Sequence, residues 1–106
     1  MNETDIMHLI QQALSPHGVV FRINVGTIKT QDGRYFSTGV MPGFSDLFGF
    51  RFSDGRAFFI ECKKPGGAVT PAQKHFIETV KSYGALAGIA RSADDALKII
   101  QEVPND

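Results

Sequence analysis

The chain has 106 residues, of which 42% are hydrophobic, so it has the size and composition of one folded domain and not of a disordered segment. Lysine plus arginine and aspartate plus glutamate number 11 each, and the resulting zero net charge argues against a protein that binds polyanions with its whole surface. No apolar run approaches the roughly 20 residues that span a bilayer, and the acidic start is unlike a secretory signal. A single cysteine and three histidines argue against a disulfide framework or a zinc site. We therefore expect one domain over residues 1–106, in the reducing cytoplasm and without a membrane partner.

Charge is unevenly spread along the chain. Residues 21–92 hold ten Lys/Arg and five Asp/Glu, whereas both ends are acidic. A positive centre fits contact with nucleic acid through a local surface. The same distribution fits equally well charged side chains that only face solvent along sheet edges and helix faces. Charge alone leaves both interpretations open.

An N-terminal helix is predicted by its cap and its periodicity. Asn2 is a favourable cap, and Asp5 stands where it completes a capping box. Apolar residues then recur on one helical face until a Pro-His-Gly stretch at residues 16–18 ends the helix. Glu3 falls in the first turn, where the helix dipole favours a carboxylate, and this alone is a sufficient reason for its presence.

Strand patterns follow the helix. Residues 19–25 alternate between apolar and polar, and residues 27–30 extend this pattern towards an Asp-Gly turn at residues 31–34. The stretch from residue 35 to residue 44 is rich in glycine and aromatic residues and predicts no definite structure.

A hairpin is predicted from residues 45–52 and 57–63, because a Ser-Asp-Gly-Arg turn joins these strand-like stretches. Strand alternation places Glu61 and Lys63 on one face of the second strand. Asp46 stands near the start of the first strand. Pairing of the two strands is therefore expected to bring Asp46 close to Glu61 and Lys63.

A helix begins at Thr70, which is its predicted N-cap. Pro71 occupies the first helical position, Gln73 closes a capping box, and Gly84 ends the helix. Gln73 is thus fully explained as a capping residue, and a role in a site is compatible with that.

The last elements are a buried strand and a helix. Residues 85–90 form the strand, Ser92 caps the helix and Pro104 ends it. The predicted order is α-β-β-β-α-β-α, which belongs to the α/β class. The strand–helix–strand unit from residue 57 to residue 90 is expected to be a parallel, right-handed crossover.

The predicted cluster has the chemistry of a phosphodiester-cleaving site. Asp46, Glu61 and the backbone carbonyl of Cys62 offer the oxygen ligands that Mg²⁺ prefers. Lys63 can orient the attacking water or stabilise the charge that develops on the phosphate. The same charged groups also fit a structural ion-pair network, and an acid-x-Lys triplet on its own is common.

The surroundings of the triplet resemble one family. The stretches that carry the resemblance are Gly43-Phe44-Ser45-Asp46-Leu47, Phe59-Ile60-Glu61-Cys62-Lys63, Lys64-Pro65-Gly66-Gly67 and Thr70-Pro71-Ala72-Gln73. Together they resemble the VRR-NUC family, the virus-type replication-repair branch of the PD-(D/E)XK nuclease superfamily, from Arg22 to Ile100. The resemblance implies a restriction-endonuclease-like core, in which helices flank a mixed sheet. Ser45 departs from the proline of many relatives, but this departure removes no ligand.

The resemblance also implies roles for individual residues. Asp46 and Glu61 would be metal ligands, Lys63 the catalytic lysine and Gln73 an active-site residue on a helix. Glu3 is the candidate for a further metal ligand from the N-terminal helix.

The predicted function is that of a DNA endonuclease dependent on Mg²⁺ or Mn²⁺, acting as a homodimer on branched DNA such as Holliday junctions. Candidate DNA-binding residues are Arg22, Lys64, Lys74 and Arg91, each of which would otherwise simply face solvent. The aromatic-rich residues 35–52 are a candidate for dimerisation or for DNA contact, and both remain open. The alternatives are a structure-nonspecific or restriction-type nuclease, a non-catalytic nucleic-acid-binding module, or a protein-interaction domain.

Overall fold

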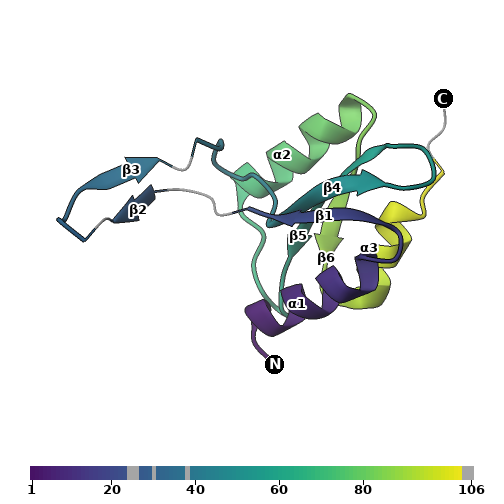
Figure 1. Ribbon diagram of the computed structural model, residues 1–106, viewed down its shortest axis with the longest axis horizontal. Helices are drawn as coiled ribbons and strands as arrows, with labels where there is room; N and C mark the ends of the chain where they lie inside the picture. Colours follow the sequence, from purple (N-terminus) through teal and green to yellow (C-terminus); the bar gives the residue numbers. More distant parts are fainter. Residues whose placement is uncertain (24–26, 30, 38, 104–106) are drawn as a thin grey trace.

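Figure 1 shows the computed structural model, in which α2 covers one face of a sheet and α1 and α3 cover the other. The structure describes residues 1–23, 27–29, 31–37 and 39–103. The elements are α1 (Glu3–Leu14), β1 (Gly18–Arg22), β2 (Thr27–Lys29), β3 (Tyr35–Ser37), β4 (Leu47–Arg51), β5 (Ala57–Cys62), α2 (Pro71–Ser82), β6 (Leu86–Ala90) and α3 (Ala93–Ile100).

The main sheet is mixed, with four strands in the order β1-β4-β5-β6. β4 pairs antiparallel with both β1 and β5, whereas β5 and β6 run parallel and are joined through α2. The strands β2 and β3 form a separate antiparallel hairpin, which extends away from the main sheet in Figure 1. With this hairpin set aside, the predicted α/β class and the order α-β-β-β-α-β-α are confirmed.

The helices begin at the side chains that the sequence predicted as caps. The Asn2 side chain accepts a hydrogen bond from the Asp5 backbone N–H at 2.8 Å, and the Asp5 carboxylate accepts one from the Asn2 backbone N–H, which completes the capping box. Ser92 caps α3 in the same way. Gly84 follows the last turn of α2 with a φ of 100°, a left-handed conformation that glycine adopts without steric cost.

Several element ends differ from the prediction. β1 ends at Arg22, and the predicted strand residues 24 and 25 lie outside the described residues, as does Pro104. β4 begins at Leu47 and not at residue 45. On the β5 side the Asp46 carboxylate accepts the hydrogen bond from the Cys62 backbone N–H, although on the other side the Asp46 carbonyl still accepts one from the Ile23 N–H, just beyond β1.

The two faces of the sheet are packed differently. Buried aliphatic residues fill the space under α1 and α3, among them Ile10, Leu14, Leu47 and Ile60. The α2 face carries an aromatic cluster instead, which consists of Phe21, Phe44, Phe48, Phe59 and Phe76. The end of this aromatic face is where Glu61 and Lys63 lie.

No helix in the described part of the chain has the length and apolar character needed to cross a bilayer. The helices α1 and α2 have 12 residues each. At 1.5 Å per residue, each is roughly 18 Å long, which is short of the roughly 30 Å hydrocarbon core.

Candidate functional site

The register of β4 and β5 places two carboxylates opposite each other. Leu47 pairs with Ile60, so the next step along both strands sets Asp46 against Glu61. The two carboxyl groups are close enough for each to influence the ionisation of the other. The predicted convergence of Asp46 and Glu61 is therefore found in the structure.

The Asp46 carboxylate is fixed by a backbone contact. Its Oδ2 accepts a hydrogen bond from the Cys62 N–H at 2.9 Å, and its carbonyl accepts one from the Ile23 N–H at 2.9 Å. The N–H and C=O of one strand residue point to the same side of the strand. The Cys62 carbonyl therefore points towards the side on which Asp46 lies, whereas the Lys63 N–H bonds Ala90 on the opposite side.

Glu61 is almost fully enclosed, with 3% of its surface exposed. Its Oε1 accepts a hydrogen bond from Gln73 Nε2 at 2.9 Å and lies 3.8 Å from Lys63 Nζ. Its Oε2 is buried and has no hydrogen-bond partner among the described residues. An unsatisfied buried acceptor costs about 1–3 kcal/mol. A ligand bound to this oxygen would remove that cost.

Burial makes both carboxylates reluctant to ionise. The pKa of Glu61 is raised to about 8, first by burial and then by the Asp46 charge, while the Lys63 ammonium opposes the shift. Burial also raises the pKa of Asp46, while the hydrogen bond from the Cys62 N–H works against the increase. Positive charge placed between these groups would relieve their repulsion. The electrostatics of the site thus favour the binding of a cation.

Gln73 serves two functions at the start of α2. Its Oε1 accepts from the Thr70 N–H at 2.9 Å and its own N–H donates to Thr70 Oγ1 at 3.1 Å, which forms the predicted capping box. The amide nitrogen of the same side chain donates to Glu61. The capping and the site contact that the sequence left open as alternatives thus occur together.

Gly43 allows the loop before Asp46 to close on α2. It has a φ of 85°, and a Cβ at this position would lie 2.3 Å from the Ala72 carbonyl oxygen. Only glycine fits so close an approach in a left-handed conformation. The loop that delivers Asp46 and the helix that delivers Gln73 are therefore held against each other.

A hollow of about 140 Å³ opens beside Asp46. Its lining residues are Glu3, Thr4, Met7, Arg22, Asp46 and Cys62. The charge of Glu3 contributes to the raised pKa of Asp46, so the first turn of α1 lies near the carboxylates. Thr4 and Met7 were not singled out from the sequence, although they follow Glu3 by one residue and by about one helical turn. The volume accommodates a cation and a few waters, since each water takes about 30 Å³.

In the described part of the chain, no three His, Cys, Asp or Glu side chains are grouped tightly enough to hold a metal ion by themselves. Asp46, Glu61 and the Cys62 carbonyl nevertheless offer three oxygens. Mg²⁺ usually keeps several water ligands and takes only one or two carboxylates. The unpartnered Glu61 Oε2 and this all-oxygen donor set therefore fit a hard divalent cation. By contrast, burial raises the pKa of the Cys62 thiol, so its sulfur is not a thiolate ligand.

The VRR-NUC domain profile matches residues 2–94 of the chain. The chain belongs to the VRR-NUC family. The matched range begins before Arg22 and ends before Ile100, so it includes α1 with Glu3 and stops within α3. VRR-NUC domains are nuclease domains of the PD-(D/E)XK type, which agrees with the mixed sheet and its flanking helices. Comparison with curated protein sequences gave no significant match.

Three of the four predicted DNA-binding residues of this VRR-NUC domain do not line the hollow. Lys64 and Lys74 are exposed. Arg91 Nη1 donates to the Lys64 carbonyl at 2.7 Å and so ties the loop after β5 to the end of β6. Arg22 is the predicted basic residue that lines the hollow with Asp46.

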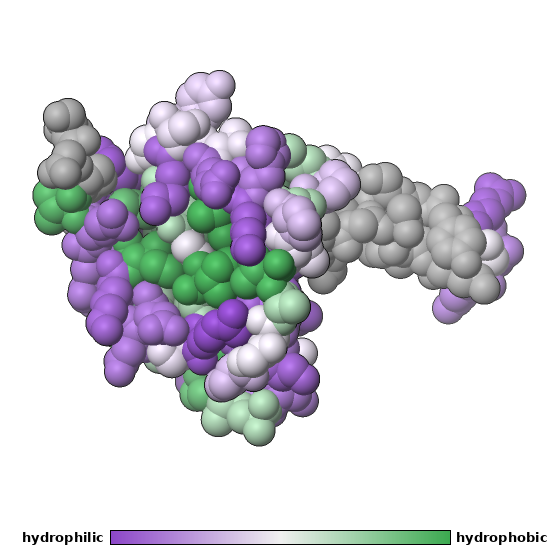
Figure 2. Space-filling view, turned by 180° about the vertical axis from the view of Figure 1, so that it is seen from behind, coloured by the Kyte–Doolittle hydropathy of each residue, from purple (hydrophilic) through white to green (hydrophobic). Residues whose placement is uncertain are grey.

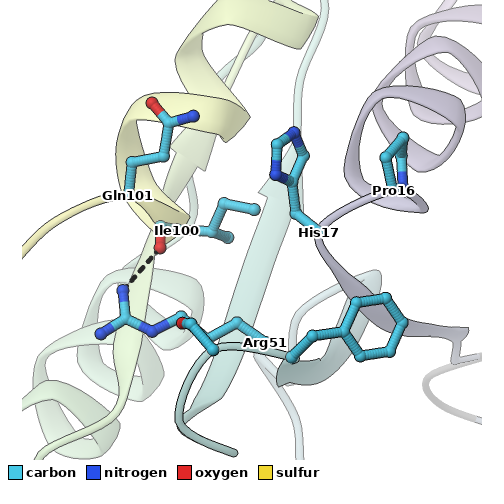
Figure 3. Close-up of a pocket in the computed structure, with 7 residues that line it drawn as sticks. Pro16, His17, Arg51, Ile100 and Gln101 are labelled. Atoms are coloured by element: carbon cyan, nitrogen blue, oxygen red, sulfur yellow. Dashed lines mark hydrogen bonds between the residues drawn. The ribbon is translucent and has the colours of Figure 1, made fainter.

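A larger cavity of about 520 Å³ lies at the opposite end of β4 (Figure 3). Its lining includes His17, Arg51 and Ile100, and none of the predicted site residues. The Arg51 guanidinium donates to the Ile100 carbonyl at 2.7 Å and pairs with Asp54. Because the Arg51 guanidinium already bonds groups within the protein, it is not available to bind an anionic substrate in this cavity of the VRR-NUC domain.

Proposed function

We propose that this VRR-NUC protein is a divalent-metal-dependent endodeoxyribonuclease that hydrolyses phosphodiester bonds. The observation that carries the proposal is the buried Glu61 carboxylate, whose Oε2 has no partner among the described residues, beside Asp46 and Lys63. A structural ion-pair network would be expected to satisfy that oxygen. A site kept for an exchangeable cation would not.

Asp46 and Glu61 are the proposed ligands of Mg²⁺ or Mn²⁺, together with the Cys62 carbonyl. When bound, the cation supplies charge neutralisation at the phosphate and makes water a better nucleophile. Gln73 donates to Glu61 Oε1, so Oε2 is the oxygen that remains for the cation. Glu3 lines the same hollow as Asp46 and is the proposed additional acidic group.

Lys63 is the proposed catalytic lysine. Its ammonium lies 3.8 Å from Glu61 Oε1, and the residue is only 8% exposed. A cation held in so enclosed a position stabilises the negative charge that develops on a phosphate more strongly than a solvated one, because little water screens it. It also orients the attacking water.

Cleavage of labelled DNA in Mg²⁺ and in Mn²⁺ tests the catalytic proposal. We expect Lys63→Ala and Asp46→Asn each to lose at least about a hundredfold in rate, as removal of one group that stabilises the transition state does elsewhere. Lys81→Ala is the matched control, because this exposed lysine lies at the far end of α2. Equal cleavage by the wild type and both site variants would end the proposal.

Branched DNA is the proposed substrate and a homodimer the proposed active form. Cutting both strands of a junction needs two active sites, which two-fold symmetry supplies. Figure 2 shows an apolar band across one side of the molecule between polar rims, which is a suitable contact surface for a second copy. A four-way junction should be cut faster than a linear duplex of the same sequence, and light scattering should give twice the mass of one chain. Equal rates on both DNAs would favour the structure-nonspecific or restriction-type alternative.

A further inference from the structure

One phenylalanine ring close to the candidate site is exposed, although aromatic side chains of this size are usually covered. Phe21, in the edge strand β1, has 46% of its surface exposed. Phe76, at the other end of the same aromatic cluster, is 4% exposed. The difference arises because α2 packs over β5 and β6, so that β1 lies outside its cover.

The exposed ring is held in a defined position. Its centroid lies 5.2 Å from that of Phe48, with the two rings tilted by 31°. Phe48 in turn contacts Phe44 and Phe59, whose rings pack on Phe76. A ring supported on one face by such a cluster loses little further freedom when a flat group stacks on its open face.

Phe21 also lies on the same face of the sheet as Glu61, because Phe48 pairs with both Phe21 and Phe59, and Glu61 follows Phe59 by two residues. It pairs with Phe48, and Phe48 stands two residues after Asp46 on β4. Phe21 and Asp46 are thus diagonal neighbours across the two strands, which are typically about 7–8 Å apart. The adjacent Arg22 points to the opposite face and lines the hollow at Asp46, so it supplies positive charge where the phosphate would lie and not beside the ring. This spacing matches the reach of one nucleotide from its phosphate to its base.

We propose that Phe21 is a stacking platform for an unpaired nucleobase of the DNA strand whose phosphate lies at Asp46 and Glu61. The proposal rests on the proposed nuclease function and specifies what the site recognises, namely a nucleotide that is free to leave the base stack. Aromatic rings beside positively charged groups bind single-stranded nucleic acid in this way. A base inside an intact duplex is not available to Phe21, so the ring would favour branched or single-stranded DNA over paired DNA.

Phe50 provides a matched control. It lies on the same face and is 42% exposed, but it stands two residues beyond Phe48, on the side away from Asp46. At about 3.4 Å per residue, its distance from Asp46 along β4 is roughly 14 Å. A base stacked next to the scissile phosphate would touch Phe21 and not Phe50. A protein partner covering this face would contact both.

The experiment compares two flap DNAs, one with normal bases in its single-stranded arm and one with abasic nucleotides there. Binding is measured by fluorescence anisotropy in Ca²⁺, and cleavage is measured separately in Mg²⁺. Stacking of one base predicts that the wild type binds the flap with bases roughly 5- to 100-fold more tightly than the abasic flap. Phe21→Ala and Phe21→Leu should lose this preference, whereas Phe21→Trp and Phe50→Ala should keep it. Phe21→Leu preserves apolar volume, which guards against loss of folding as the cause.

The outcomes separate the two proposals. If the preference for bases persists in Phe21→Leu, or if the wild type shows none, the stacking proposal is overturned. It is also overturned if Phe21→Leu and Phe50→Ala both reduce the molecular mass in light scattering, because the face would then be a protein interface. If base-dependent binding is lost in Phe21→Leu while the wild type cleaves no DNA in Mg²⁺, the stacking proposal holds and the nuclease proposal fails.

Discussion

Replacing Glu61 by glutamine should stabilise the metal-free protein at alkaline pH. Glu61 is buried, and its pKa is raised from the ordinary 4.5 to about 8. The folded protein therefore binds more protons at this site than the unfolded chain does between these two pH values. Stability must fall as the pH rises through this window, because the unfolded state ionises freely while the folded state resists ionisation. Glutamine keeps the shape and the acceptor for Gln73 but does not titrate.

The magnitude follows from the size of the pKa shift. A shift from 4.5 to about 8 corresponds, at about 1.4 kcal/mol per pKa unit, to a cost on the order of 4 kcal/mol at pH 8. Relaxation and water entry reduce such values in real proteins, so a measured difference of at least 1 kcal/mol between variant and wild type is expected at pH 8. The two should converge below about pH 4, where the wild-type carboxyl becomes neutral in the unfolded state as well as in the folded one.

Urea unfolding between pH 4.5 and pH 9 in EDTA measures this difference directly. Glu78→Gln is the control, since it removes an exposed carboxylate from α2 without touching the site. Addition of Mg²⁺ or Mn²⁺ should stabilise the wild type and leave Glu61→Gln almost unchanged, because metal binding to the folded state alone adds to its stability. Parallel pH profiles for the wild type and Glu61→Gln would refute the reasoning that Glu61 is buried at an energetic cost.

Three further substitutions test the parts around this carboxylate. Gly43→Ala places a Cβ 2.3 Å from the Ala72 carbonyl oxygen at a left-handed position, so urea unfolding should show a loss of about 1–3 kcal/mol, together with slower DNA cleavage. Ser45→Ala removes a buried hydroxyl that has no hydrogen-bond partner among the described residues, so the free energy of unfolding should stay the same or rise by up to about 1 kcal/mol. Gln73→Ala removes the side-chain half of the α2 capping box and the hydrogen bond to Glu61, so unfolding should show a loss of about 1 kcal/mol and calorimetry a 10- to 100-fold weaker affinity for Mn²⁺.

The amino-acid sequence by itself determined the elements and the composition of the site. Caps at Asn2, Thr70 and Ser92 are local signals, because the residues that they join are three positions apart. The alternation of Glu61 and Lys63 is likewise a property of any strand. Pairing of the two hairpin strands places Asp46 beside them. The helix signals alone predict only the capping role of Gln73, and the family resemblance implies its place in the site.

Only the tertiary structure decided the burial of the site residues and the pKa values that result from it. The burial of Glu61 and its unpartnered oxygen depend on α2 and on Asp46, which are distant in the chain. The Asp46 carboxylate accepts the Cys62 N–H across 16 residues and β4 begins only at Leu47, neither of which any periodicity predicts. Phe21 is exposed because α2 covers only part of the sheet. Local patterns fix which face a residue occupies, but desolvation and pKa depend on what the rest of the chain brings against that face.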